Sequence, residues 1–409
     1  MPDGGRVKAA SMTDGFLPYG RQTIEDDDIA AVTAALKADL LTTGPRVAEF
    51  ERAFADAVGA PHAVVCNSGT AALHMAVKAA DLQPGEICVV PPITFVATAN
   101  VVRFEGGEVV FCDVDPDTGL MTAETLRQAL PRAHGKHVRA ILPVHLRGDP
   151  IALGEIRKIA DRLDAVVIED ACHAVGSMSG NNPVGACADS AMACFSFHPV
   201  KTICTGEGGA VTTRDEQVAA RLRLAREHGL KRDPAEFILE DEAFDEGVAN
   251  PWWYEQVELG WNYRLPDVNC ALGLSQLNKL VRFSARRRAL VARYRQVLAP
   301  LAPVVQTIDA PRGSDPVLHL MQVRIDFEAA GRSRREVMAR LRAKGIGTQV
   351  HYIPVHRQPY WRARYGLVDL PGADAFYAKT LSLPLFPSMR DDDPDRVAEA
   401  LSEALAHDR

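Results

Sequence analysis

The sequence predicts an α/β protein in which a large domain with a mixed, mostly parallel sheet precedes a smaller α+β domain. The chain has 409 residues, more than a single hydrophobic core usually serves, so two domains are expected. From residue 24 to residue 213 short apolar runs alternate with amphipathic helical patterns, which is typical of strands connected by helices. We therefore predict a disordered tail at 1–16, a large domain at 17–270 and a small domain at 271–409.

The elements of the large domain follow from this alternation. Helical spacing of apolar residues is clearest in VAEFERAFADAVG, GTAALHMAVKAA and LGEIRKIADRLD. Short, nearly continuous apolar runs predict buried strands of a parallel sheet. These runs are HAVVCN, EICVVPP, GEVVFCDV, RAILPVH, AVVIED and SAMACFSF.

The last third of the chain has a different pattern. ALGLSQLNKLVRFSARRRALVARYRQVLAPLAP predicts one long helix that leads into the second domain. HLMQVRI and IGTQVHYIP predict strands, and SRREVMARLRAKG between them predicts a helix closed by Gly345. An acidic segment from His228 to Gly260 precedes them, and its aromatic trio WWY favours a local cluster over an interface.

Composition excludes several classes of protein. A formal charge of −7 gives no reason to expect nucleic acid or an anionic membrane as a partner. No apolar run approaches the length of a membrane span, and the N-terminus has no signal-peptide pattern, so we predict a cytoplasmic protein. The eight cysteines form no CxxC pair, and His351 and His356 lack carboxylate partners, so we expect buried thiols and no metal site.

Three predicted strand ends carry polar groups of complementary chemistry. SGTAAL follows the first strand and opens a helix, where backbone N–H groups favour a phosphate. Asp170 ends VVIED, and a carboxylate there stabilises a protonated ring nitrogen. Lys201 follows FSF, and its amine suits a Schiff base with an aldehyde. A phosphate, a protonated pyridine and an imine together indicate pyridoxal 5'-phosphate.

Each of these features has an ordinary structural explanation when it stands alone. SGTAAL could be a plain capped helix start, Asp170 could cap a turn, and a single lysine is usually a surface charge. The order of the three along the chain is what favours a cofactor site.

Several longer motifs occur in order along the chain: SGTAALHMAV, PPITFVATAN, IEDACHAVGS, FSFHPVKTICTGEGGAV, REHGL, GWNYRLPDVNCALGLSQL and HYIPVHRQPYW. By these motifs the chain resembles the DegT/DnrJ/EryC1/StrS aminotransferase family from about residue 17 to residue 405. The resemblance implies an aspartate-aminotransferase-like fold (fold type I), an enzyme that aminates nucleotide-linked keto-sugars, and pyridoxal phosphate in the large domain.

The resemblance also implies roles for individual residues. Lys201 would be the Schiff-base lysine and the catalytic base, and Asp170 would pair with the pyridinium nitrogen. Phe95 and His173 would lie on the cofactor ring, although both could be ordinary core residues. The phosphate would be bound by Thr70, Ala71 and Ser196, with Asn262 of a partner subunit, which requires a homodimer with shared active sites.

Within the family, LPYGRQTIEDDDIAAV, LLTTGP and VHYIPVHRQPYW most resemble the transaminases of the pseudaminic acid pathway. Those use L-glutamate to convert a UDP-linked 4-keto-6-deoxy-N-acetylhexosamine into UDP-4-amino-4,6-dideoxy-N-acetyl-β-L-altrosamine. PVHLRGDP departs from the related PVHYAG form, so Arg147 could alter substrate contacts. The resemblance assigns the substrate to Tyr19, Thr42, Thr43, Gly44, Pro45, Ser68, His351 and Tyr352.

Other functions stay open at this point. Transaminases that make 4-amino-4-deoxy-arabinose share most of these features, including LSLPLFP. A related sugar dehydratase would carry histidine in place of the Schiff-base lysine, and this sequence keeps Lys201 there. A cofactor-binding regulator would need a basic DNA-binding module, which is not visible. A non-enzymatic scaffold of the same fold would not need Lys201, Asp170 and SGTAAL intact.

Overall fold

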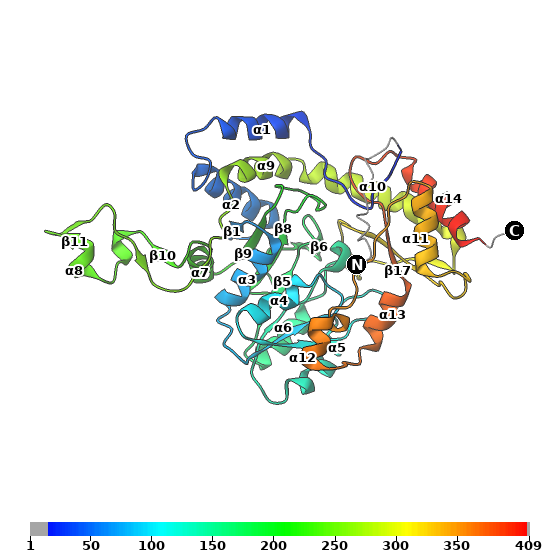
Figure 1. Cartoon of the computed structure of the whole chain (residues 1–409), viewed down its shortest axis with the longest axis horizontal. Helices are drawn as coiled ribbons and strands as arrows, with labels where there is room; N and C mark the ends of the chain where they lie inside the picture. The colour runs from blue at the N-terminus through cyan, green and yellow to red at the C-terminus, as the bar shows by residue number, and fades with distance from the viewer. Residues whose placement is uncertain (1–14, 407–409) are drawn as a thin grey trace, which may run out of the picture.

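A seven-stranded mixed sheet forms the centre of the molecule, in a computed structural model that describes residues 15–406 (Figure 1). The strand order is β1-β9-β8-β5-β4-β2-β3, and only β9 runs antiparallel to its neighbours. The mixed, mostly parallel sheet that the sequence predicts is therefore confirmed. The strands are β1 (His62–Cys66), β2 (Ile87–Val90), β3 (Glu108–Phe111), β4 (Val138–Ile141), β5 (Val166–Asp170), β8 (Met192–Ser196) and β9 (Gly209–Thr213).

Apolar packing on both faces explains the nearly continuous apolar runs of these strands. In β1, Val64 and Cys66 join one buried cluster, whereas Ala63 and Val65 join another. Successive side chains of a strand point to opposite faces, so each strand must be apolar on both sides.

Helices surround the sheet, and several begin with recognisable caps. In α3, the Ser68 side chain accepts a hydrogen bond from the Ala71 N–H at 3.0 Å. α1 lies along α9 at the edge of the large unit (Figure 1). The helices of this part are α1 (Asp26–Leu36), α2 (Pro45–Val58), α3 (Gly69–Ala79), α4 (Ala97–Phe104), α5 (Ala123–Ala129), α6 (Gly154–Arg162), α7 (Glu216–Arg226) and α9 (Asp267–Leu277).

A second, smaller unit is built on a three-stranded antiparallel sheet, β14-β16-β17. Its strands β14 (Val305–Thr307), β16 (Met321–Ile325) and β17 (Thr380–Leu383) share a core with three helices. The helices are α10 (Leu280–Leu298), α11 (Arg334–Ala343) and α14 (Asp393–Leu405). Two further helices, α12 (Pro359–Tyr365) and α13 (Pro371–Lys379), contribute Trp361 and Phe376 to the core of the large sheet instead.

The start of the described chain belongs to this second unit. Leu17 forms a β-bridge with Ile346, and its side chain is buried in the second core. The predicted disordered tail lies outside the described residues except for Gly15 and Phe16. The Gly15 carbonyl accepts a hydrogen bond from Arg396 at 2.6 Å. The division at residue 270 stays a prediction.

The acidic segment forms an arm that extends away from the body (Figure 1). It contains α8 (Glu240–Ala243) and two small hairpins, β10 (Leu230–Lys231) with β13 (Glu255–Gln256) and β11 (Phe244–Asp245) with β12 (Val248–Ala249). Trp252 and Tyr254 are 71% and 52% exposed on this arm, and the choice of a local cluster over an interface stays a prediction.

A third small sheet joins the two units. It has the order β15-β6-β7 and consists of β6 (Met178–Ser179), β7 (Asn182–Pro183) and β15 (Ser314–Asp315). All eight cysteines are free thiols, and seven of them are buried. Among residues 15–406, no helix combines the length and the apolar character that crossing a bilayer requires.

Candidate active site

A cavity of about 740 Å³ opens at the carboxyl ends of β1, β5 and β8. Ser68 follows β1, Asp170 ends β5 and Ser196 ends β8, and all three line the cavity, which we call the cleft. Ligands of open α/β sheets bind at this edge because loops of several strands meet there. The strand ends that the sequence singles out are therefore brought together.

Lys201 enters the cleft from the turn after β8. Its backbone N–H donates to the His198 carbonyl at 2.8 Å, which fixes the turn. Its amine has no hydrogen bond or ion pair with any described residue. Burial lowers the pKa of the Lys201 amine, and the nearby Cys172 and Asp170 offset this only in part. A desolvated amine of lowered pKa is suited to act as a nucleophile and base.

Asp170 is a buried carboxylate held in a fixed orientation. The Thr98 hydroxyl donates to its Oδ2 at 2.6 Å, and the Cys172 N–H donates to its Oδ1 at 3.2 Å. Thr98 in turn contacts the Thr94 hydroxyl at 2.7 Å. No cation is ion-paired with Asp170 among the described side chains, so its charge is available to a cationic ring nitrogen in the cleft.

The start of α3 forms a cradle of backbone groups. Gly69 lies so close to β8 that a Cβ placed on it would be 2.8 Å from the Ser196 Cβ. A Cβ on Gly209 would collide with the Ser68 carbonyl. The first N–H groups of a helix have no intrahelical partner and attract anions. Because Ser68 Oγ caps only Ala71, the N–H groups of Gly69 and Thr70 fit a phosphate.

Three buried histidines and a tyrosine also line the cleft. The His173 ring lies 4.6 Å from the His319 ring, and its Nε2 is 3.1 Å from the Tyr352 hydroxyl. His351 Nδ1 contacts the Ser382 hydroxyl at 2.8 Å. Burial lowers the pKa of all three imidazoles, that of His351 to about 3, so they are neutral near pH 7.

The structure brings most of the predicted site residues into the lining of the cleft. Phe95 is 58% exposed there, and its ring lies 6.2 Å from that of Tyr352. The predicted residues that line the cleft are Tyr19, Ser68, Thr70, Phe95, Asp170, His173, Ser196, Lys201, His351 and Tyr352.

The remaining predicted residues lie outside the lining. The Ala71 N–H is already taken by Ser68 Oγ, so its phosphate contact stays a prediction. Asn262 is exposed, and its carbonyl accepts a hydrogen bond from Asn67 Nδ2 at 3.4 Å. The predicted substrate turn begins α2 at the surface, where the Gly44 N–H donates to Asp267 at 2.7 Å. This turn comprises Thr42, Thr43, Gly44 and Pro45.

Sequence reasoning missed Thr98, His319 and Asn67, all of which line the cleft. The spacing of Thr94 and Thr98 in ITFVAT, one helical turn apart, is a signal for Thr98. Asn67 directly follows β1 and could have been named by the strand-end rule. Nothing around His319 marks it locally, because it reaches the cleft from just before β16.

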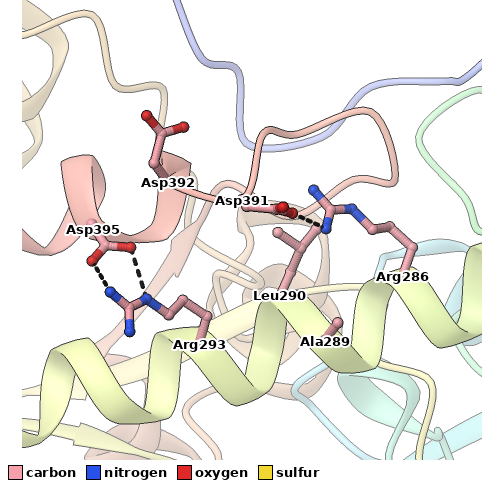
Figure 2. A pocket seen from close by; sticks show the side chains of 7 residues that line it. All are labelled: Arg286, Ala289, Leu290, Arg293, Asp391, Asp392 and Asp395. Atoms are coloured by element: carbon pink, nitrogen blue, oxygen red, sulfur yellow. Dashed lines mark hydrogen bonds and ion pairs between the residues drawn. The ribbon is translucent and has the colours of Figure 1, made fainter.

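A second hollow, of about 450 Å³, lies between α10 and the start of α14, and we call it the groove (Figure 2). Its arginines are neutralised by its own aspartates: Arg286 pairs with Asp391, and Arg293 forms a bidentate pair with Asp395. With both cations satisfied, the groove offers no free charge to a ligand, and its ion pairs connect two helices.

Comparisons with known proteins agree with the chemistry of the cleft. Residues 22–402 match the sequence profile of the DegT/DnrJ/EryC1/StrS aminotransferase family. Helicobacter pylori PseC, an aminotransferase involved in the biosynthesis of pseudoaminic acid, is 26% identical with a TM-score of 0.85, covering 95% of this chain and 99% of that one.

Two further solved structures are similar over nearly the whole chain. DesI, solved in the presence of its TDP-sugar product, is 32% identical with a TM-score of 0.82, covering 97% of this chain and 94% of its own. Spr1654 from Streptococcus pneumoniae, in its PMP form, is 25% identical with a TM-score of 0.84, and the match covers 95% and 99% of the two chains.

Proposed function

Because the chain belongs to the DegT/DnrJ/EryC1/StrS aminotransferase family and is a pyridoxal-phosphate-dependent aminotransferase, we propose that it aminates a nucleotide-linked keto-sugar. The acceptor is a UDP-linked 4-keto-6-deoxy-N-acetylhexosamine and the donor is L-glutamate. The products are UDP-4-amino-4,6-dideoxy-N-acetyl-β-L-altrosamine and 2-oxoglutarate, as in pseudaminic acid biosynthesis. The similarity to PseC over 95% of the chain supports this choice of sugar.

The observation that carries the proposal is the partly exposed Lys201, whose amine has no partner among residues 15–406 and lies in the same cleft as Asp170. Pyridoxal phosphate supplies an aldehyde that carries the amino group and a ring that withdraws electrons. Lys201 Nζ then takes a proton from Cα of glutamate and later returns one to C4 of the sugar. Burial lowers the pKa of this amine, which favours the neutral form that the proton transfer needs.

Other residues of the cleft hold and orient the reacting groups. The Asp170 carboxylate, fixed by Thr98, would keep the ring nitrogen of the bound cofactor protonated. Thr70, Ser196 and the start of α3, all at the cleft, would bind the phosphate, and Phe95 and His173 would contact the ring. We assign the sugar nucleotide to Tyr19, Ser68, His351 and Tyr352, with the exposed turn at 42–45 at the entrance.

The charge of the cleft favours a homodimer with shared active sites. Among the described residues that line the cleft, Lys201 is the only lysine or arginine. A phosphate, a nucleotide diphosphate and the two carboxylates of glutamate carry more negative charge than one amine can balance. A cytoplasmic dimer in which Asn262 and its neighbours reach the partner's cleft would complete the site.

The first experiment follows the visible absorbance of the purified enzyme with pyridoxal phosphate as glutamate is added. The proposal predicts that the yellow band bleaches, and a band that persists would contradict glutamate as the donor. The bleached enzyme is then given the UDP-linked keto-sugar or a TDP-linked analogue. Nitrogen in the UDP-sugar product supports the proposal, whereas amination of the TDP-sugar alone would contradict the UDP assignment. A sugar product without nitrogen would indicate a dehydratase.

A further inference from the structure

Arg147 and Asp149 form a buried ion pair behind the cleft. The two side chains are 1% and 0% exposed, and the Arg147 guanidinium donates to the Asp149 carboxylate. Neither side chain lines the cleft, so any effect of Arg147 on substrate contacts must be indirect. A buried charge is costly to leave unpaired, so this pair must hold its turn firmly.

The turn places Arg147 in an unusual backbone conformation. Its φ is +64°, in the left-handed region that residues other than glycine, asparagine and aspartate rarely adopt. The next residue, Gly148, leaves no room for a side chain, because a Cβ there would lie 2.9 Å from the His173 carbonyl. The ion pair thus fixes a strained turn directly against the segment that carries His173.

The backbone of Arg147 holds two of the cleft histidines. Its N–H donates to His173 Nδ1 at 3.3 Å, and its carbonyl accepts from the His319 N–H at 2.6 Å. The first contact also decides where the imidazole hydrogen lies. A backbone N–H can only donate, so Nδ1 must be the acceptor. A neutral His173 therefore carries its hydrogen on Nε2.

The position of the His173 hydrogen also fixes the direction of the hydrogen bond between His173 and Tyr352. His173 Nε2 is 3.1 Å from the Tyr352 hydroxyl oxygen, so the imidazole donates and the hydroxyl accepts. Burial raises the pKa of the Tyr352 phenol, which keeps its own hydrogen. No described residue accepts that hydrogen. Since Tyr352 lines the cleft, its hydroxyl is left as a donor towards whatever binds there.

We propose that Arg147 and Asp149 are positioning residues that set the hydrogen-bond polarity of the cleft through His173. Their ion pair holds the Arg147 N–H on Nδ1, which makes Tyr352 a donor to an oxygen atom of the bound reactants. A carbonyl, carboxylate or phosphate oxygen can accept a hydrogen bond from such a donor. The inference rests on the proposed function only in taking the cleft as the place where the sugar binds.

The first test reads the tautomer of His173 without any reaction. The 12 histidines are labelled with ¹⁵N in the full-length enzyme, and the His173 signals are assigned by their loss in His173→Gln. We expect the Nε2–H tautomer in the native protein and a mixture of tautomers in Arg147→Met. Arg293→Met, which breaks the exposed ion pair of the groove, is the matched control and should leave the His173 signals unchanged. An Nδ1–H tautomer in the native protein, or no change in Arg147→Met, would overturn the proposal.

The second test asks whether Arg147 acts through Tyr352. Tyr352→Phe should lower kcat/KM for the sugar about tenfold, as expected for one lost hydrogen bond. Arg147→Met should have a similar effect alone and less than a twofold further effect in the Tyr352→Phe background. Losses that multiply in the double variant would show that Arg147 acts elsewhere.

Folding of the variants is monitored by thermal unfolding. If Arg147→Met does not fold, Asp149→Asn carries both tests, and Arg147→Lys should restore most of the native values because it keeps the charge. A variant that unfolds at a lower temperature while both its tautomer and its kcat/KM stay native would reduce the ion pair to a purely structural role and overturn the proposal. A failed assignment of the sugar would change none of the NMR results, so the two proposals fail separately.

Discussion

The cleft and the groove are both hollows lined by ionisable side chains, but they differ in whether these side chains are ion-paired. In the groove each arginine is paired with an aspartate, and these side chains remain in contact with water. In the cleft the Lys201 amine is partly desolvated and has no partner among the described residues, and the neighbouring imidazoles are neutral. Charged groups that satisfy one another stabilise the fold, whereas a desolvated group without a partner is available for chemistry.

The largest effect that would test this contrast is the loss of the unpaired amine. Lys201→Ala removes both the nucleophile and the base, so turnover should fall by a factor of about 10⁴ or more. Steady-state amination of the sugar is the measurement. Lys158→Ala, at a lysine that is exposed and paired with Glu155, is the control and should retain native turnover.

Asp170→Asn should have the next largest effect. The amide keeps the size of the carboxylate and its hydrogen-bond acceptor for Thr98, but it loses the charge that holds the ring nitrogen protonated. We expect kcat to fall about 10²-fold or more, in line with the loss of an electrostatic contact in a buried site. An unchanged kcat, with cofactor binding intact by absorbance, would remove Asp170 from this role.

The neutral histidines of the cleft should appear in the pH dependence of stability. The pKa of His351 is about 3 in the folded protein and about 6.5 in an unfolded chain. Between these values the unfolded state binds a proton that the folded state does not, so stability falls as the pH falls. His351 should contribute a slope of about 1.4 kcal/mol per pH unit.

Urea unfolding between pH 6.5 and 4 measures this slope. In His351→Asn, which retains an acceptor for the Ser382 hydroxyl, the free energy of unfolding should fall less steeply with acid by that amount. If the free energy of unfolding falls equally steeply with acid in the two proteins, His351 is protonated in the folded state. The cleft would then hold a charged imidazole, which contradicts the difference between the cleft and the groove.

The smallest effect is expected in the groove itself. Arg293→Gln breaks the bidentate pair with Asp395, both of which are exposed, so kcat and KM should stay native and the unfolding temperature should change little. A clear loss of activity would show that the ion pairs of the groove affect catalysis in the cleft. It would contradict the view that the groove serves only the stability of the fold.

The meeting of Lys201 and Asp170 in one cleft could be predicted from the sequence because its signals are local. Lys201 and Asp170 each follow an apolar strand, and the strand-end rule places such residues at one edge of a sheet. Thr98 had a weaker signal in its spacing from Thr94. His319 had none, because its place in the cleft depends on how the segment before β16 packs against the loop at Arg147.

The sequence by itself determined the fold class, the cofactor chemistry and the family, since these depend on apolar periodicity and on short motifs such as SGTAAL and FSFHPVK. Only the tertiary structure decided that Arg147 is buried with Asp149 outside the lining of the cleft, and that its N–H meets His173. The reason is physical: periodicity reports which residues are buried, but the partner of a buried polar group is chosen by segments far apart in the chain that meet only in the folded state.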